Sequence, residues 1–269
     1  MFRKLYCLII ATIFTSCLSI ANKNRCKREL STNEMYEILS HSLKNEDLEI
    51  IDLDCNRRTI SQNKLNEIGR DSLQSEYWMG DNNIIYKLNC TGTPTLDQRI
   101  LETLVLYHRF GYIPDRNLEE VKIEVDCNNL KETYDDLVNI DQKIRSNPEI
   151  LNSEFASIDN QKSLKFIKIL GKCGIQIEHI DQIWLLNHHS PIDIQMRNYL
   201  SLKMINESGY LPNKKLAYSQ DRILMLWGFK QEYGSQISPI FKEENVNERR
   251  KRVGLGPIEE YIKLFQKNE

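Results

Sequence analysis

The stretch from Tyr218 to Gln236 reads Y-S-Q-D-R-I-L-M-L-W-G-F-K-Q-E-Y-G-S-Q, and Asn245 to Leu255 reads N-V-N-E-R-R-K-R-V-G-L. The first stretch begins as a helix in which Asp221 and Arg222 precede five apolar residues, and Gly228 is the expected stop. Glycine and amide residues follow, so we expect a turn or small hairpin over 229–241. A charged pair beside so apolar a run needs partners, because desolvating an unpaired ion costs several kcal/mol.

The rest of the second half repeats apolar residues at helical spacing. Helices are expected over 130–145, 148–173, 179–188, 192–207, 244–252 and 257–265. Short connections between helices favour a mainly α, bundle-like domain with at most a minor β-hairpin element.

Local signals are weaker in the first half. Ser31 and Glu34 have capping-box spacing, and Thr95 is a suitable cap for a helix over 96–110. Leu65, Ile68, Leu73 and Trp78 indicate one interrupted helix. Short strands are expected at 84–86, after an Asn-Asn turn, and at 121–125.

The N-terminus has the pattern of a secretory signal. Arg3 and Lys4 precede an apolar run over 5–15 that is too short to span a bilayer. Cys17 follows this run as in a relaxed bacterial lipobox, which predicts a lipid anchor at Cys17 in the cell envelope. The alternative is cleavage before Asn22 and a periplasmic or secreted soluble protein. The expected divisions are a signal peptide over 1–16, a polar tether over 17–30, a mostly helical region over 31–130 and a helical domain over 131–269.

Composition limits the function classes. The net charge of −2, with 28% charged and 41% hydrophobic residues, is typical of a globular protein and does not favour nucleic acid as a partner. Five cysteines lie beyond Cys17, an odd number that predicts at least one free thiol. None has C-x-x-C spacing, so no cysteine metal site is expected. The sequence shows no metal motif, phosphate loop or nucleophile elbow, and it names no cofactor.

His189 and Asp221 are the candidate catalytic residues. His188 and His189 end a helix, where an imidazole can cap or pack against the chain. Adjacent helical residues point about 100° apart, so the two histidines are poorly placed to hold one metal. His189 remains a candidate general base, with Asp221 and Arg222 orienting a substrate.

The candidate ligand-binding residues follow Gly228. Gln231, Tyr233 and Gln236 offer neutral donors and acceptors, which suit a small polar ligand or equally satisfy the turn's own backbone. Arg249 and Arg250 suit phosphate or carboxylate, or a solvated face. We expect one neighbourhood to contain His189, Asp221, Arg222, Tyr233, Gln236 and Arg249 or Arg250. If partners surround Arg222, its replacement by alanine costs ~3 kcal/mol or more.

Ordered motifs over residues 137–265 resemble the bacterial family catalogued as domain of unknown function 6624. They are D-Q-x-x-R from Asp141, D-N at Asp159, W-L-L leading from Trp184 to His189, Y-x-x-D-R from Tyr218, Q-x-Y-G-x-Q from Gln231, R-R at Arg249, V-G-L at Val253 and E-E-Y at Glu259. Ser235 and His188 depart mildly from the family pattern. The resemblance implies no activity.

Three functions remain open from the sequence. The favoured one is an exported, lipid-anchored protein whose C-terminal domain binds a small polar or anionic ligand, or an envelope protein partner. The second is an envelope hydrolase or transferase that uses His189 with Asp221 and Arg222. The third is a structural interaction module in which the polar residues only support the fold. An open concave site joining His189, Arg222 and Gln236 would favour a ligand or an enzyme.

Overall fold

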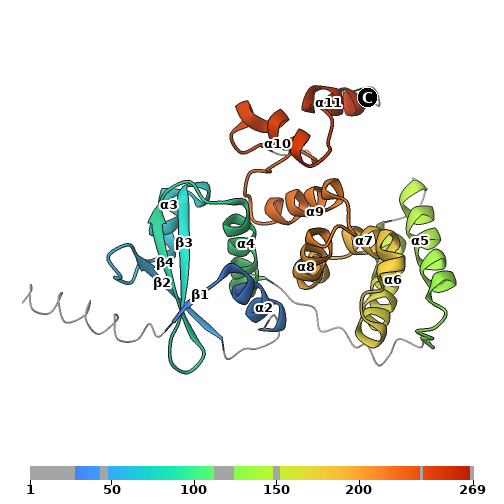
Figure 1. The fold of residues 1–269 in the computed structure, drawn as a ribbon, viewed down its shortest axis with the longest axis horizontal. Coiled ribbons are helices and arrows are strands. Elements are labelled where there is room, and N and C mark those ends of the chain that lie inside the picture. The colour runs from blue at the N-terminus through green and yellow to red at the C-terminus, as the bar shows by residue number, and fades with distance from the viewer. Residues whose placement is uncertain (1–27, 43–47, 112–123, 148–151, 237–238, 267–269) are drawn as a thin grey trace, which may run out of the picture. The chain divides into compact units, whose positions relative to one another are not determined.

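A computed structural model describes residues 28–42, 48–111, 124–147, 152–236 and 239–266 (Figure 1). The chain forms two compact units, with the division between Arg109 and Phe110. The protein is mainly α-helical, as the sequence predicts, but its sheet is larger than the expected minor hairpin. The leader, Cys17 and Cys26 lie outside the described residues.

The sheet belongs to the first unit. Its strands are β1 (Arg28–Leu30), β2 (Glu49–Asp54), β3 (Leu73–Met79) and β4 (Ile84–Thr91), in the spatial order β1, β3, β4, β2. β3 pairs antiparallel with β1 and β4, whereas β2 runs parallel to β4. Asn82 and Asn83 turn the chain with φ of 54° and 59°, which asparagine tolerates better than most residues. The predicted strand at 84–86 is confirmed as the start of β4.

The predicted helix that includes Leu65 and Trp78 is wrong in its second part. Leu65 lies in α3 (Gln62–Ile68), but Trp78 lies in β3. Ser75 and Tyr77 are buried in β3 while Gln74 and Glu76 are exposed, as the two-residue period of a strand requires. Backbone pairing with β4 therefore overrides the local helical spacing. In the described part of residues 31–130, helices alternate with strands β2, β3 and β4, and most of the strand expected over 121–125 lies outside the described residues.

Helices α2 (Thr32–Ser42) and α4 (Leu96–Phe110) begin where the capping signals predict. The Ser31 hydroxyl accepts from the Glu34 N–H at 3.3 Å, and the Glu34 carboxylate accepts from the Ser31 N–H at 2.8 Å. Figure 1 shows the two helices beside each other, and the Tyr36 hydroxyl of α2 donates to the Asp97 carbonyl of α4 at 2.9 Å. Both helices bury apolar side chains, including Leu39 and Leu104.

A buried charge network also joins α4 to the sheet. The Lys87 ammonium group is 2% exposed and contacts the carboxylates of Asp52 and Glu102, while Arg109 Nη1 lies 2.5 Å from Asp52 Oδ2. Opposite charges satisfy one another here, so the network stabilises the first unit without leaving a group for a ligand. A disulfide between Cys55 and Cys90 further links the end of β2 to β4.

The second unit is helical. Its helices are α5 (Leu130–Ser146), α6 (Asn152–Cys173), α7 (Ile180–His189), α8 (Ile192–Glu207), α9 (Asn213–Met225), α10 (Val246–Arg252) and α11 (Ile258–Gln266). Tyr134, Phe166 and Leu186 are central to a core that α5, α6 and α7 share, and a disulfide joins Cys127 to Cys173 at the end of α6. The predicted helix positions and the irregular segment after Gly228 are confirmed. Within the described part of the chain, each helix is too short or too polar to cross a bilayer.

Candidate functional site

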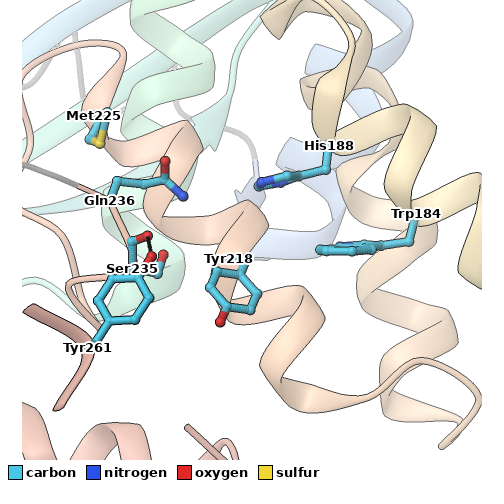
Figure 2. A pocket seen from close by; sticks show the side chains of 7 residues that line it. All are labelled: Trp184, His188, Tyr218, Met225, Ser235, Gln236 and Tyr261. Atoms are coloured by element: carbon cyan, nitrogen blue, oxygen red, sulfur yellow. Dashed lines mark hydrogen bonds between the residues drawn. The ribbon is translucent and has the colours of Figure 1, made fainter. Parts of the chain in front are cut away.

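A pocket of about 510 Å³ lies in the second unit, between α7 and α9 (Figure 2). Its lining residues are Trp184 and His188 of α7, Tyr218 and Met225 of α9, Ser235 and Gln236 of the following loop, and Tyr261 of α11. Trp184 and His188 are four residues apart, and Tyr218 and Met225 are seven apart, so each pair lies on one stripe of its helix. The pocket is therefore built from two helix faces and closed at one end by the loop.

Aromatic rings form one wall of the pocket. The rings of Trp184 and His188 stack with centroids 5.2 Å apart and planes inclined by 16°. Trp184 Nε1 donates to the Lys215 carbonyl at 2.9 Å, and the Lys215 ammonium lies 4.9 Å from the indole centroid. These contacts hold the indole in place. The wall can accept a flat or apolar group without rearrangement.

Two side chains that line the pocket, His188 and Gln236, have polar atoms without a hydrogen-bond partner among the described residues. In Figure 2 the side chains of His188 and Gln236 point toward each other across the pocket. His188 Nδ1 is buried and has no hydrogen-bond partner among the described residues. The Gln236 side-chain amide likewise makes no hydrogen bond to a described residue. Burial, together with the charges of Arg222 and His189, lowers the pKa of His188 to about 3. His188 is therefore a neutral imidazole at pH 7, with one donor and one acceptor.

Asp221 organises the loop after Gly228. Its carboxylate is fully buried and accepts from the backbone N–H groups of Glu232 at 2.8 Å, Tyr233 at 3.0 Å and Ser235 at 2.8 Å. Burial raises the pKa of Asp221, and these backbone hydrogen bonds oppose that rise. The carboxylate lies beneath the loop and is not part of the pocket wall.

Gln231 and Gly234 complete the loop structure. The Gln231 side chain accepts from the Gln236 N–H at 2.7 Å and donates to the Gln236 carbonyl at 2.8 Å. Gly234 has φ of +64°, and a Cβ atom there would lie 2.7 Å from Ile240 Cδ1. Glycine is required at this position both by the backbone conformation and by the space. Gln231 is thus a support for Gln236 and does not itself line the pocket.

The two arginines of α10 also bond to this loop. Arg249 Nε donates to the Glu232 carbonyl at 2.9 Å, and Arg250 donates to the carbonyls of Tyr233 at 2.7 Å and Gly256 at 2.6 Å. The Arg250 side chain is buried, and the Asp221 charge acts on it favourably. Because these guanidinium N–H groups of Arg249 and Arg250 donate to backbone carbonyls, they are not directed at a ligand.

A second cluster surrounds Asp141, whose side chain has 0% exposure. One carboxylate oxygen accepts from Lys162 Nζ at 2.5 Å and Arg145 Nε at 3.0 Å, and the other lies 2.5 Å from His189 Nδ1. Burial alone would raise the pKa of Asp141, but the bonds from His189 and Lys162 hold it well below its usual range. Asp159 Oδ1 in turn accepts from Arg145 and Lys162, at 3.0 Å and 2.7 Å. We call Asp141, Arg145, Asp159, Lys162 and His189 the dyad cluster.

Arg222 does not line the pocket, but its charge acts on the pocket residue His188 and on Arg145 and Asp159 of the dyad cluster. Arg222 falls on the stripe of α9 that carries Tyr218 and Met225, at spacings of four and three residues. Its charge lowers the pKa of His188, and the Arg145 charge acts on Arg222 itself. The guanidinium is part-buried, and the described residues provide it with no hydrogen bond and no ion pair. Burial, followed by repulsion from Arg145, lowers the pKa of Arg222.

The structure therefore divides the residues predicted to share one neighbourhood. The residues that form the loop and its supports are Asp221, Gln231, Tyr233, Arg249 and Arg250. Gln236 lines the pocket, and His189 belongs to the dyad cluster. Arg222 does not line the pocket. The described residues give Arg222 no direct hydrogen bond or ion pair, in contrast to the partners expected around it, and Asp159 attracts its charge without contact. The sequence neighbour of Arg222, Asp221, points into the loop because adjacent helical residues diverge by about 100°.

Several site residues were missed as candidates. Asp141 and Arg145 stand four apart on one face of α5, a spacing typical of an ion pair. Lys162 lies on the same helical stripe as the buried Phe166 and Ile169, which marks it as a lysine in need of a buried carboxylate. The pocket residues Trp184, Tyr218 and Tyr261 have no distinguishing local signal, because aromatic residues at helical spacing usually belong to a core.

The comparisons with known proteins add no relative: no protein-family model, curated protein or solved structure matches the chain. The class of protein rests on the structure alone. It is a mainly α-helical protein whose second unit carries an aromatic pocket beside a buried ionic cluster. No group of three or more histidine, cysteine, aspartate or glutamate side chains in the described ranges is arranged to hold a metal ion.

Proposed function

We propose that the second unit binds a small organic anion, with Arg222 as the residue that holds its charge. The observation that carries this proposal is the part-buried Arg222 guanidinium, which lacks a hydrogen-bond or ion-pair partner among the described residues. An arginine in that setting costs free energy in the unliganded protein. A bound carboxylate or phosphate would restore the missing hydrogen bonds, because both match the guanidinium fork.

The charge balance of the neighbourhood supports an anion. Asp141 and Asp159 are matched by Lys162 and Arg145 through direct ion pairs. Arg222 then adds a further positive charge, which attracts the Asp159 carboxylate without forming a direct ion pair, because Asp159 already pairs with Arg145 and Lys162. Because His188 is neutral, it adds no further charge, and the site carries an excess of one positive charge when His189 is neutral too.

The pocket supports an anion with a flat or apolar body. Trp184 and Tyr218 offer ring surfaces, while His188 and Gln236 offer donors and acceptors that have no protein partner among the described residues. A volume of about 510 Å³ is within the range of small-molecule sites. A pocket with these features is not needed by a purely structural module, and it is narrow for a folded protein partner.

Thermal stability with simple probes tests this proposal. We expect phenyl phosphate or benzoate at 10 mM to raise the melting temperature of the full chain by ~3 °C or more, since a ligand at tenfold its Kd stabilises by about 1.4 kcal/mol. Arg222→Gln should abolish the shift. Arg252→Gln is the matched control, because Arg252 is 69% exposed and pairs with Glu248 on its own helix. Equal shifts in both variants would contradict the role of Arg222.

Export and lipid attachment form the second part of the proposal. The signal pattern before Cys17 carries it, and the disulfides Cys55–Cys90 and Cys127–Cys173 agree with it, because disulfides persist outside the reducing cytosol. Mass spectrometry of the mature protein should find a lipidated Cys17 as the first residue. An unmodified protein that begins at Asn22 would support the soluble periplasmic or secreted alternative.

Membership of the family catalogued as domain of unknown function 6624 remains part of the proposal. Its support is that residues from three of the quoted motifs gather in the dyad cluster: Asp141 and Arg145 from D-Q-x-x-R, Asp159 from D-N, and His189 after W-L-L. Residues kept in a family for binding or chemistry are expected to be close in space although distant in sequence.

A further inference from the structure

The hydrogen bond between His189 and Asp141 determines where the imidazole proton lies. Lys162 and Arg145 both donate to Asp141, so its carboxylate is ionised and can only accept hydrogen bonds. Its partner His189 Nδ1 must therefore carry a proton. In the neutral imidazole, Nε2 is then left with a free lone pair, which is the form of histidine that acts as a base.

His189 is held in position and remains accessible. Its backbone carbonyl accepts from Arg145 Nη2 at 2.9 Å, and its ring bonds to Asp141, so both main chain and side chain are fixed. The side chain is 20% exposed, and within the described residues nothing bonds to Nε2. A purely structural histidine would use both nitrogens or bury the second one.

The arginines Arg145 and Arg222 could stabilise the negative charge of a transition state beside His189. The ring centroids of His189 and His188 are 5.6 Å apart, so the hydrogen-bonded pair of His189 and Asp141 lies next to the pocket wall. The charges of Arg145 and Arg222 both act on His188. The Arg222 guanidinium, on which the charges of Arg145 and Asp159 both act, is then the cation available to stabilise an anionic transition state beside His189.

We propose that His189 is the general base of a phosphoester hydrolase site in the second unit. Nε2 removes a proton from water, the water oxygen forms a bond to phosphorus, and the phosphorus bond to the ester oxygen breaks. The imidazolium then returns the proton to the departing oxygen, so His189 is unchanged at the end. Arg222 holds the phosphoryl oxygens, and Asp141 is a positioning residue for His189. This inference rests on the anion binding proposed above.

Hydrolysis of bis(p-nitrophenyl) phosphate and p-nitrophenyl phosphate by the full chain tests the inference. His189→Ala should lower kcat by ~100-fold or more, the usual scale of general-base catalysis, and added imidazole should restore part of the rate. His179→Ala is the control, because His179 lies in the same unit at the start of α7 and its ring packs on Tyr134. It should hydrolyse both compounds at the wild-type rate.

The positioning role of Asp141 has its own readout. Asp141→Asn should lower kcat by ~100-fold with little change in KM. An asparagine can donate as well as accept a hydrogen bond, so it no longer fixes the proton on His189 Nδ1. Circular dichroism must first show that the variant is folded. A loss of kcat that merely follows a loss of folded protein would overturn this role.

Three results would overturn the inference. They are no hydrolysis of either phosphoester by the wild type, an unchanged rate in His189→Ala, and hydrolysis confined to p-nitrophenyl acetate. The thermal shift with phenyl phosphate separates the two proposals. If the wild type and His189→Ala both show the shift but neither hydrolyses a phosphoester, anion binding stands and catalysis falls. If Arg222→Gln keeps the shift, the anion-binding proposal itself falls.

Discussion

The Asp221 carboxylate accepts a hydrogen bond from the backbone N–H of Ser235 at 2.8 Å, across 14 residues of sequence. Two more N–H groups, from Glu232 and Tyr233, bond to the same carboxylate. One fully buried side chain thus replaces the regular backbone pairing that the loop lacks. It also sets where Ser235 and Gln236 meet the pocket.

Asp221→Asn should therefore loosen the loop. An asparagine has one acceptor oxygen and turns its NH₂ toward backbone donors, so we expect a loss of about 3 kcal/mol in the free energy of unfolding. Hydrogen exchange of the Tyr233 and Ser235 amides should accelerate before the rest of the unit. Asp181→Asn is the control, because Asp181 is 73% exposed and should cost under ~0.5 kcal/mol. Unchanged exchange at Tyr233 would show that the loop does not depend on Asp221.

Asp141→Asn should destabilise the protein in a pH-dependent way. The pKa of Asp141 is lowered in the folded state, so its stabilising contribution is present above the unfolded value near 4 and is lost as pH falls below it. Urea unfolding should show a loss of about 3 kcal/mol at pH 7, since Lys162 keeps only Asp159 as a partner. The difference from wild type should shrink below about pH 4. Asp135→Asn, an exposed pair with Lys131, should show little difference at pH 7.

Removing the Arg222 charge should stabilise the unliganded protein. Arg222→Met keeps the length of the side chain but removes a desolvated cation that Arg145 repels, so we expect a gain of about 1 kcal/mol in chemical denaturation. This reverses the loss of ~3 kcal/mol expected from the sequence, which assumed protein partners around Arg222. Arg252→Met should change stability by less than ~0.5 kcal/mol. A large loss in Arg222→Met would mean that the guanidinium has protein partners after all.

His188 should make the second unit sensitive to mild acid. Its pKa is lowered to about 3 in the folded state, against about 6.5 in an unfolded chain, so the folded state favours the neutral ring. This contribution to stability is complete above about pH 6.5 and is lost as pH falls toward 3. The loss amounts to roughly 3 kcal/mol at pH 4.5.

NMR of the His188 ring at pH 5 should show a neutral imidazole. His188→Gln should lose less stability than wild type between pH 7 and 4.5, although it starts lower because the stacking on Trp184 is lost. His179→Gln should keep the wild-type pH dependence. A His188 ring that titrates near 6.5 would contradict the burial argument.

The sequence by itself determined the features that depend on neighbours within one or two turns. Thr95 caps α4 because its hydroxyl reaches the Gln98 N–H at 3.2 Å, and Gly228 ends α9 because it adopts φ of +74°. Both are contacts or conformations of residues close in the chain, so spacing and residue type are sufficient to predict them. The helices of the second unit follow in the same way from apolar periodicity.

Tertiary structure alone decided which distant groups meet. β3 became a strand because β4 supplies its backbone partners, and the His189 ring bonds to Asp141, 48 residues away, which the sequence did not single out as a site residue. A helix presents several polar residues on its faces, and only the packing of α5, α6 and α7 selects the pair that comes within 2.5 Å. On α9, Arg222 has no direct hydrogen bond or ion pair with the described residues. Sequence spacing cannot foresee this, because it encodes the direction of a side chain but not the element that lies opposite.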